Sequence, residues 1–197
     1  MIAAIQNFLY QCALSFDLPI LDWIQANLTS DALDSFMSVV THLGSAGSLI
    51  AIAVVLLIFP KTRKLGLGMG LAMAIGLLVC NITLKPLIAR IRPYDLQAQM
   101  GVTIHLLIGE MHDFSFPSGH TIATFEAATV MLKNNKLVGI PAILLACVIA
   151  FSRLYLYVHY PTDVLFSVVF GILFGILGNF LAQKINIAPK KRGKYEA

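Results

Sequence analysis

Residues 152–163 read Ser-Arg-Leu-Tyr-Leu-Tyr-Val-His-Tyr-Pro-Thr-Asp and place Arg153, His159 and Asp163 in a stretch that is apolar on both sides. A charged side chain at the centre of a membrane helix costs roughly 2.5 to 3.5 kcal/mol on insertion scales, so these groups need partners or a function. Pro161 suits the first turn of a helix, which sets Asp163 about one turn beyond His159. A carboxylate there can hold one imidazole nitrogen and leave the other free for nucleophilic attack. A helix cap beside a structural ion pair is the alternative interpretation.

The composition is that of an integral membrane protein. Apolar residues make up 58% of the 197 residues and charged residues 12%, with a mean hydropathy of +0.81, whereas a soluble domain has about 25% charged residues. All 14 Lys and Arg residues follow residue 60, so the amino terminus lacks the basic start of a signal peptide and we expect no cleavage. The 3 cysteines match neither a zinc site nor a disulfide framework, and we expect them to be packing residues.

Apolar runs predict an all-α fold, a polytopic bundle of transmembrane helices. About 20 apolar residues cross a bilayer. We expect five spans, at residues 36–59, 65–84, 120–132, 137 to about 152 or 158, and 164–182. Small residues at four-residue spacing let neighbouring helix backbones approach closely. They are Gly66, Gly70 and Ala74 in one span and Gly171 and Gly175 in another.

The first 35 residues form a separate region. Residues 1–16 carry no charge but are marginal in length, so they form either an interfacial helix, which we favour, or a sixth span. Residues 18–35 are amphipathic and Trp23 suits a headgroup anchor, so this segment should lie along the membrane surface. The expected domain is a single one over 1–197, with 1–35 interfacial or a marginal span, 36–182 as the helical core and 183–197 as a basic tail.

The basic residues predict the orientation. Counting crossings from residue 36 places ten of the 14 Lys and Arg on one side, within 61–64, 133–136 and 184–194. The positive-inside rule makes that side, with the carboxyl terminus, cytoplasmic. The other four are Lys85, Arg90, Arg92 and Arg153, which fall on the outer side with His120, His159 and Asp163. Their coincidence favours a convergent anion site over a set of flanking membrane anchors.

Three motifs make up this outer group. The first is Lys85 with Arg92-Pro93, the second is Pro117-Ser118-Gly119-His120, and the third is Ser152-Arg153 with His159 and Asp163. A turn of small residues that leads into a helix offers backbone amides and a positive dipole end to an anion. An ordinary helix start, with Ser118 as its N-cap, is the alternative for the second motif.

Together the motifs closely resemble the signature of the type 2 phosphatidic acid phosphatase superfamily of lipid phosphate phosphatases. That signature is a Lys, six residues and Arg-Pro; then Pro-Ser-Gly-His; then Ser-Arg, five residues, His, three residues and Asp. All three parts occur here in the family's order and internal spacing. The family core usually has six transmembrane helices, so the region before residue 36 is where this chain departs from it.

The resemblance implies a role for each motif residue. His159 attacks phosphorus and forms a phosphohistidine, Asp163 holds its tautomer, and His120 protonates the leaving oxygen. The groups that clamp the phosphoryl oxygens are Lys85, Arg92, Arg153, the Ser118 hydroxyl and the Gly119 amide. We expect no metal and no cofactor, because these cations supply the neutralising charge and no convincing carboxylate cluster is present.

Other polar residues receive structural or solvated roles. Glu126 lies about 240° around the helix from His120, so we favour a structural hydrogen bond for it. Solvated loop positions are expected for Arg90, His105, His112 and Asp113, and a structural role for His42.

The leading hypothesis is a lipid phosphatase at the outer membrane face, with a lipid phosphate and membrane lipids as its partners. In a bacterial setting the resemblance points to undecaprenyl pyrophosphate or phosphatidylglycerol phosphate, with phosphatidic acid as another candidate. Lipid phosphotransfer is an alternative reaction, since any acceptor that displaces water could take the phosphoryl group. A non-catalytic anion or lipid transporter is the alternative of another class. Vanadium haloperoxidases share the motifs, but five apolar spans argue against that soluble class. Nothing suggests nucleic acid, because the basic tail is short and lies at the membrane.

Overall fold

The computed structural model describes residues 1–185, and within them every regular element is a helix. The α-helices are α1 (Ile2–Cys12), α2 (Leu18–Asn27), α3 (Asp31–Leu43), α4 (Ala46–Ile58), α5 (Arg63–Gly76), α6 (Lys85–Ile88), α7 (Pro93–Gln99), α8 (Gly119–Asn134), α9 (Lys136–Tyr155) and α10 (Pro161–Lys184). Two π-helical segments, η1 (Ala13–Asp17) and η2 (Leu77–Leu84), continue α1 and α5 without a break. This confirms the predicted all-helical class.

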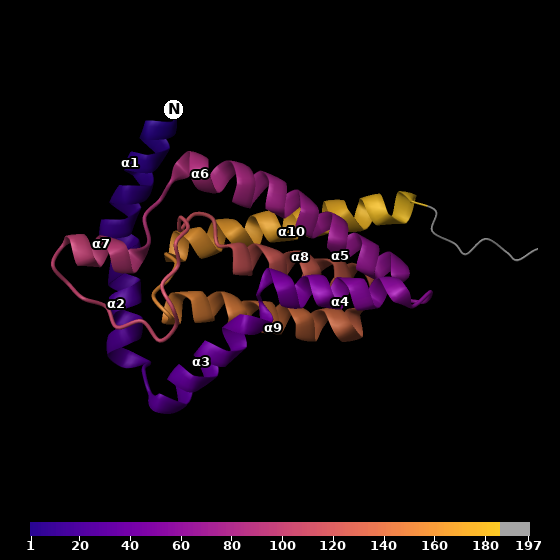
Figure 1. Cartoon of the computed structure of the whole chain (residues 1–197), viewed down its shortest axis with the longest axis horizontal. Coiled ribbons are helices and arrows are strands. Elements are labelled where there is room, and N and C mark those ends of the chain that lie inside the picture. Colours follow the sequence, from indigo (N-terminus) through magenta and orange to yellow (C-terminus); the bar gives the residue numbers. More distant parts are fainter. Residues whose placement is uncertain (186–197) are drawn as a thin grey trace, which may run out of the picture.

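Helices α4, α5, α8, α9 and α10 run along the long axis of the molecule, with α8 in the middle (Figure 1). Helix α8 packs against α10, α9, α5 and α4. Of its 16 residues, nine are buried, so it faces protein on nearly every side. The central helix is therefore the scaffold from which the second motif, at its amino-terminal end, is presented.

Glycines set the closest helix contacts. A Cβ atom at Gly171 or Gly175 of α10 would lie 2.8 or 2.9 Å from a carbonyl oxygen of α8, and one at Gly178 would lie 2.6 Å from a backbone nitrogen of α5. On α5, a Cβ at Gly66 would lie 2.6 Å from a carbonyl oxygen of α4, but one at Gly70 would meet nothing within 4 Å. The expected packing role holds for the α10 pair and for Gly66, and Gly70 faces open space.

The predicted single span over residues 36–59 is wrong as one helix. Helices α3 and α4 meet at a bend of 48°. The break falls at Gly44, where an added Cβ would lie 2.5 Å from a methyl group of Ile149 on α9, and at Ser45, whose hydroxyl accepts from the Ser48 amide at 3.2 Å and caps α4. Helix α3 also starts earlier than expected, because Ser30 provides its N-cap.

The number of membrane crossings stays a prediction. By length and composition, three helical stretches of residues 1–185 could cross a bilayer, or four if the bent α3–α4 pair is one span. The three are Arg63–Gln99, Lys136–Tyr155 and Pro161–Lys184. Helix α8 has 16 residues, about 24 Å of rise, which is less than the hydrocarbon thickness of about 30 Å.

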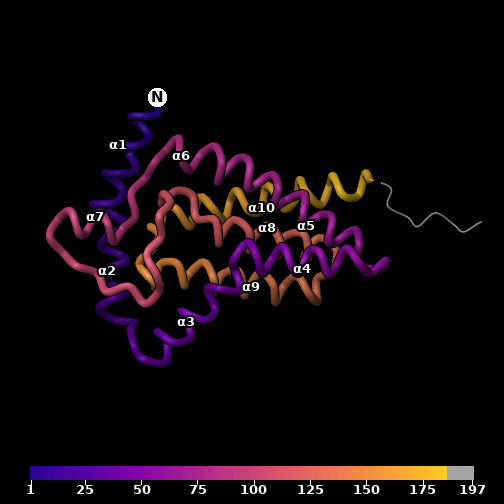
Figure 2. The backbone as a smooth tube through the Cα atoms, viewed as in Figure 1, coloured from indigo at the N-terminus to yellow at the C-terminus, as the bar shows by residue number. Residues whose placement is uncertain are grey.

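The amino-terminal helices lie across one end of the bundle, where α1, η1 and α2 follow one another (Figures 1 and 2). The amphipathic segment expected over 18–35 is two helices, since α2 ends at Asn27 and α3 starts at Asp31. Trp23 is 57% exposed, as a headgroup anchor would be. Leu21 and Ile24 face inward and pack in a core shared with the chain between α9 and α10.

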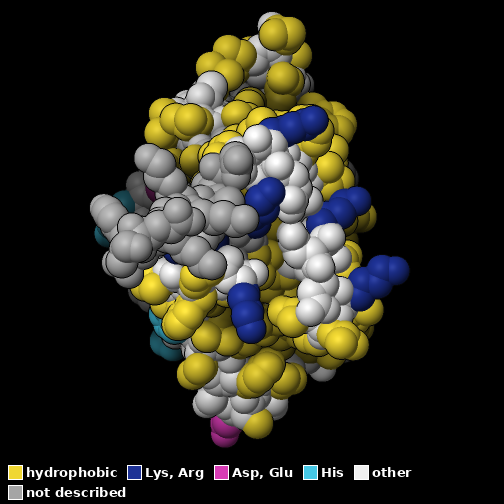
Figure 3. Space-filling view, turned by 90° about the vertical axis from the view of Figure 1, so that its right-hand side faces the viewer, with side chains coloured by type: hydrophobic (Ala, Val, Ile, Leu, Met, Phe, Trp, Pro, Cys, Tyr) yellow, Lys and Arg dark blue, Asp and Glu magenta, His cyan; other side chains and the backbone are white. Residues whose placement is uncertain are grey.

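The opposite end of the bundle is basic (Figure 3). Its exposed cations lie where α4 meets α5, where α8 meets α9, and at the end of α10, and they are Lys61, Lys64, Lys133, Lys136 and Lys184. The expected basic tail falls mostly on residues 186–197, which lie outside the described part of the chain.

Candidate active site

The three sequence motifs meet at the end of the bundle that α1 and α2 cross. Lys85 is the first residue of α6, Arg92 is the N-cap of α7, His120 lies in the first turn of α8, and His159 lies between α9 and α10. All four of these side chains line one cavity, which has a volume of about 560 Å³. Gly119 lines it as well. Its remaining wall is largely apolar and comes mainly from α4, α5 and α8.

Two strained backbone positions frame this arrangement. Ala89 has φ 49° and ends α6, and Tyr157 has φ 58° in the connection before His159. They are the non-glycine residues with positive φ within residues 1–185. Such conformations cost about 1–3 kcal/mol each and persist where the surroundings hold them. The turn at Ala89 lets Lys85 and Arg92, on either side of it, reach the same partner.

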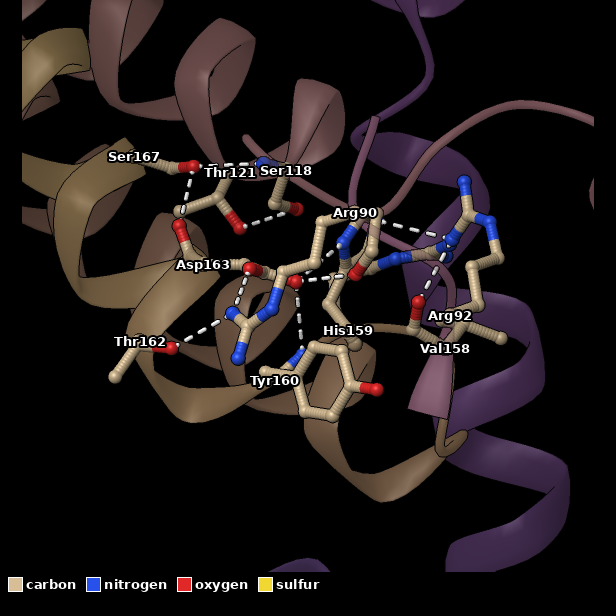
Figure 4. A network of polar contacts seen from close by, with 12 residues as sticks. Arg90, Arg92, Ser118, Thr121, Val158, His159, Tyr160, Thr162, Asp163 and Ser167 are labelled. Atoms are coloured by element: carbon tan, nitrogen blue, oxygen red, sulfur yellow. Dashed lines mark hydrogen bonds and ion pairs between the residues drawn. The ribbon is translucent and has the colours of Figure 1, made fainter. Parts of the chain in front are cut away.

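His159 is 2% exposed and stands between a cation and a carboxylate (Figure 4). Its Nε2 lies 3.4 Å from Arg92 Nη1, and its Nδ1 lies 3.6 Å from Asp163 Oδ2. Burial, with the positive charges of Arg92 and Arg153, lowers the pKa of His159 well below its usual value. The imidazole is therefore neutral and keeps a lone pair, which is the state that a nucleophile needs.

Asp163 occupies the third position of α10, and Pro161 begins that helix, as the sequence predicted. Oδ2 of Asp163 accepts the Tyr160 amide at 3.0 Å and the Ser115 hydroxyl, and Oδ1 accepts Arg90. The distance to His159 Nδ1 is slightly longer than a hydrogen bond. Nδ1 makes no hydrogen bond within residues 1–185. The carboxylate is thus rigidly held beside the imidazole, one short movement from contact.

Lys85 and Arg92 share a carboxylate. Lys85 Nζ and Arg92 Nη2 each donate to an oxygen of Asp113, and Arg92 Nε donates to the Asp113 carbonyl at 2.8 Å. Burial by itself raises the pKa of Asp113, but the hydrogen bonds and charges of the two cations outweigh it and lower the pKa to about 2. The solvated loop position expected for Asp113 is confirmed, since its side chain is 55% exposed, but the expectation did not include its pairing with the two cations. Its carboxylate stands where two cations converge, as a phosphoryl group would.

Two predicted phosphate ligands lie behind the cavity. Arg153 is completely buried, its Nη1 donates to Thr41 Oγ1 at 2.6 Å, and it is absent from the cavity lining. Ser118 is also fully buried, and its Oγ accepts from Thr121 at 3.0 Å. Its amide donates to Ser167 Oγ at 2.8 Å, and Ser167 in turn donates to the Asp163 carbonyl (Figure 4). In this state of the protein these groups support the site from outside it.

Arg90 was expected in a solvated loop, and this is wrong. It is 8% exposed and joins Asp163 to Asp17, a residue that is completely buried. A signal for Asp17 existed in the sequence, since a lone charge at the end of an uncharged run must find a partner once it is buried. Nothing local identified Arg90 as that partner, because 73 residues separate the two.

Glu126 lies deeper along the same cavity. It is 1% exposed, and its Oε1 has no hydrogen-bond partner in the described part of the chain. The structural hydrogen bond that we favoured is thus missing for that oxygen. The carboxyl group instead packs on Gly76 of α5, where an added Cβ would lie 2.1 Å from Oε1. No three His, Cys, Asp or Glu side chains of residues 1–185 gather as they would around a metal ion.

Residues 65–186, more than half of the chain, match the PAP2 superfamily. The chain belongs to this superfamily. It is 31% identical over 134 residues to an undecaprenyl-diphosphatase of Sulfolobus acidocaldarius, which covers 68% of this chain and 63% of that protein. It is 33% identical over 141 residues to undecaprenyl-diphosphatase BcrC of Bacillus subtilis, covering 71% of this chain and 70% of that one.

The fold is similar to that of a solved membrane enzyme. The crystal structure of the first transmembrane PAP2 type phosphatidylglycerolphosphate phosphatase from Bacillus subtilis aligns with a TM-score of 0.64 and 28% identity. The alignment covers 90% of this chain and 97% of that one. The apolar helices and these relatives define a helical membrane protein, and the relatives' names differ in the lipid on which they act.

Proposed function

We propose that this protein is a membrane lipid phosphatase that works through a phosphohistidine. The observation that carries the proposal is a neutral, buried His159 at the polar end of a cavity whose other walls are largely apolar. A phosphate fits the cationic end and a lipid chain fits the remainder. In this proposal the whole chain is one membrane-embedded domain, with 36–182 as its core.

In the first step, Nε2 of His159 attacks phosphorus, because Nδ1 faces Asp163 and Nε2 faces Arg92. The new N–P bond forms as the bond from phosphorus to the leaving oxygen breaks, which is the bridging oxygen of a lipid pyrophosphate or the ester oxygen of a lipid monophosphate. His120, in its protonated form, gives that oxygen a proton. The attack leaves a positive charge on the imidazole, which Asp163 stabilises from 3.6 Å or less. In the second step, water attacks phosphorus, His120 takes its proton, and phosphate leaves while His159 returns to its neutral form.

Lys85 and Arg92 neutralise the phosphoryl oxygens during both steps. Asp113 must first release them, so the bound phosphate replaces one anion with another. The Gly119 amide at the start of α8 is a further donor toward the cavity. Arg153 and Ser118 contribute charge and alignment from behind it. This assignment needs no metal, because the two cations supply the charge that a divalent ion would bring.

We propose undecaprenyl pyrophosphate as the substrate, with phosphatidylglycerol phosphate as the second candidate. The apolar wall along α4, α5 and α8 suits a long hydrocarbon chain, and two relatives carry the name undecaprenyl-diphosphatase. The chain is 28% identical to the phosphatidylglycerolphosphate phosphatase, which is close to its 31% and 33% identity to the two undecaprenyl-diphosphatases. Phosphate release from purified protein, measured with both lipids and phosphatidic acid in excess EDTA, tests the choice. Phosphate binding without release would favour the transporter, and transfer to an added lipid alcohol would favour the phosphotransferase.

The proposed site faces outward. The end of the bundle opposite the cavity carries the exposed cations where α4 meets α5 and where α8 meets α9 (Figure 3). The positive-inside rule favours that end, with the carboxyl terminus, as the cytoplasmic one.

A further inference from the structure

Arg90 lies at the centre of a buried polar network beside the catalytic candidates (Figure 4). Nη1 donates to an Asp163 oxygen and, at 2.8 Å, to Thr162 Oγ1. Nη2 donates to Asp17 Oδ2 at 2.7 Å and to the Leu9 carbonyl at 2.9 Å. The guanidinium also stacks on an aromatic ring, 3.8 Å from its centroid. The contacts to Asp163, Asp17 and Leu9 are buried, so these charges interact far more strongly than surface charges do.

Asp17 reaches the same helix end from the other side. Its Oδ1 accepts the Thr162 amide at 2.9 Å, and its Oδ2 accepts the Thr162 hydroxyl at 2.7 Å. An aspartate of the amino-terminal helices thus completes the first turn of α10, next to Asp163. Asp17 lies outside residues 65–186, which match the superfamily, so the shared motifs say nothing about it.

The charge balance gives this network a chemical consequence. One guanidinium lies between two carboxylates, so the buried group of three carries a net charge of −1. Without Asp17, Arg90 would pair with Asp163 alone, and the net charge facing His159 would fall to zero. The phosphohistidine step places a positive charge on His159, 3.6 Å from Asp163. A neutralised Asp163 would stabilise that charge much less.

We infer that Asp17 and Arg90 are positioning residues for the phosphoryl transfer. Arg90 fixes the plane of Asp163, and Asp17 keeps Arg90 from neutralising it, so that Asp163 can stabilise the phosphohistidine. The inference rests on the proposed function of His159 and Asp163. The alternative is a purely structural contact that holds α1 and α2 on the bundle.

A double-mutant cycle separates the two roles. The variants are Asp17→Asn, Asp163→Asn and both together, and the probe is radiolabelled farnesyl pyrophosphate, so that slow residual rates remain measurable. We expect Asp17→Asn to lower kcat at least tenfold with KM within twofold of wild type. In the Asp163→Asn background the same change should alter kcat by less than twofold, because the carboxylate on which Asp17 acts is gone.

If Asp17 had a purely structural role, Asp17→Asn would lower kcat by the same factor in the wild-type and in the Asp163→Asn background. That result would overturn the inference. Wild-type turnover by Asp163→Asn would instead refute the proposed role of Asp163, so the two failures are distinguishable. Asp22→Asn is the matched control, since Asp22 ties α2 to Tyr157 and Gln97 without touching Asp163. It should keep kcat within twofold.

Two further variants guard against misfolding. Asp17→Glu keeps the charge and should recover kcat to within threefold of wild type, which a mere gap in packing would not allow. If Asp17→Asn does not fold, Arg90→Lys takes its place in the cycle. The lysine keeps the positive charge but lacks the two guanidinium nitrogens that bind one carboxylate each. It should lower kcat only where Asp163 is present, and equal losses in both backgrounds would again contradict the inference.

Discussion

Asp113 determines whether Lys85 and Arg92 are free for a substrate. Its pKa of about 2 lies below its usual value, so it is ionised throughout pH 5–8 and would lose its charge only as the pH falls toward 2. A phosphate must therefore compete with a permanent internal anion. Because the side chain is 55% exposed, water helps to release it, and the competition costs little.

Asp113→Asn should strengthen substrate binding. Removing the internal anion leaves the binding-competent state more populated, so KM for the lipid phosphate should fall about three- to tenfold, while kcat changes little. Steady-state kinetics at pH 7 measure this. Glu110→Gln, on the same loop, is the control and should leave KM unchanged. An increase in KM for Asp113→Asn would mean that Asp113 assists binding.

The sequence predicted the placement of side chains that belong to a local motif. It missed side chains whose placement depends on partners far away in the chain. His159 and Asp163 lie on either side of one helix start, so their spacing alone predicted their proximity. Arg90 and Asp17 have no such spacing, and their burial follows from how α1 and η1 cross the bundle. Composition could not predict that a lone aspartate of a surface-like helix would be fully buried.

Helix α10 packs through its glycines more tightly than any larger residue would allow. The predicted start of this helix and its small-residue face are both found, because a proline, an acidic third position and repeated glycines are local signals. The break between α3 and α4 was missed, since Gly44 and Ser45 lie in an uncharged run that also suits a continuous span. The close approach of Gly44 to α9 and the cap that Ser45 provides for α4 explain why the chain bends there.

Gly178→Ala should destabilise the bundle. The new methyl group would lie 2.6 Å from a backbone nitrogen of α5, and overpacking of this kind costs about 1–3 kcal/mol. Thermal unfolding in detergent should show a lower midpoint. Gly70→Ala introduces the same methyl group into open space and should show no loss. Equal midpoints for the two variants would mean that α10 and α5 are less closely packed than described.

At the scale of the whole molecule, residues 1–185 have one end that carries the proposed active site and an opposite end that is basic, and this asymmetry predicts the sidedness of the protein. A cysteine introduced by Glu110→Cys should react with an impermeant thiol reagent in intact cells, and one introduced by Lys61→Cys should react only after permeabilisation. Both belong in a background without the native cysteines, of which Cys147 is exposed. The opposite pattern would place the chemistry in the cytoplasm, and would contradict the proposed outward-facing site.

The most direct test of the mechanism is to trap the phosphorylated enzyme. Wild-type protein quenched during turnover of a substrate radiolabelled in its phosphate should carry acid-labile label on His159. His159→Ala should bind the same lipid, carry no label and release no phosphate, since no neighbouring side chain can replace the nucleophile. Label on another residue, or phosphate release by His159→Ala near the wild-type rate, would contradict a phosphohistidine at this position.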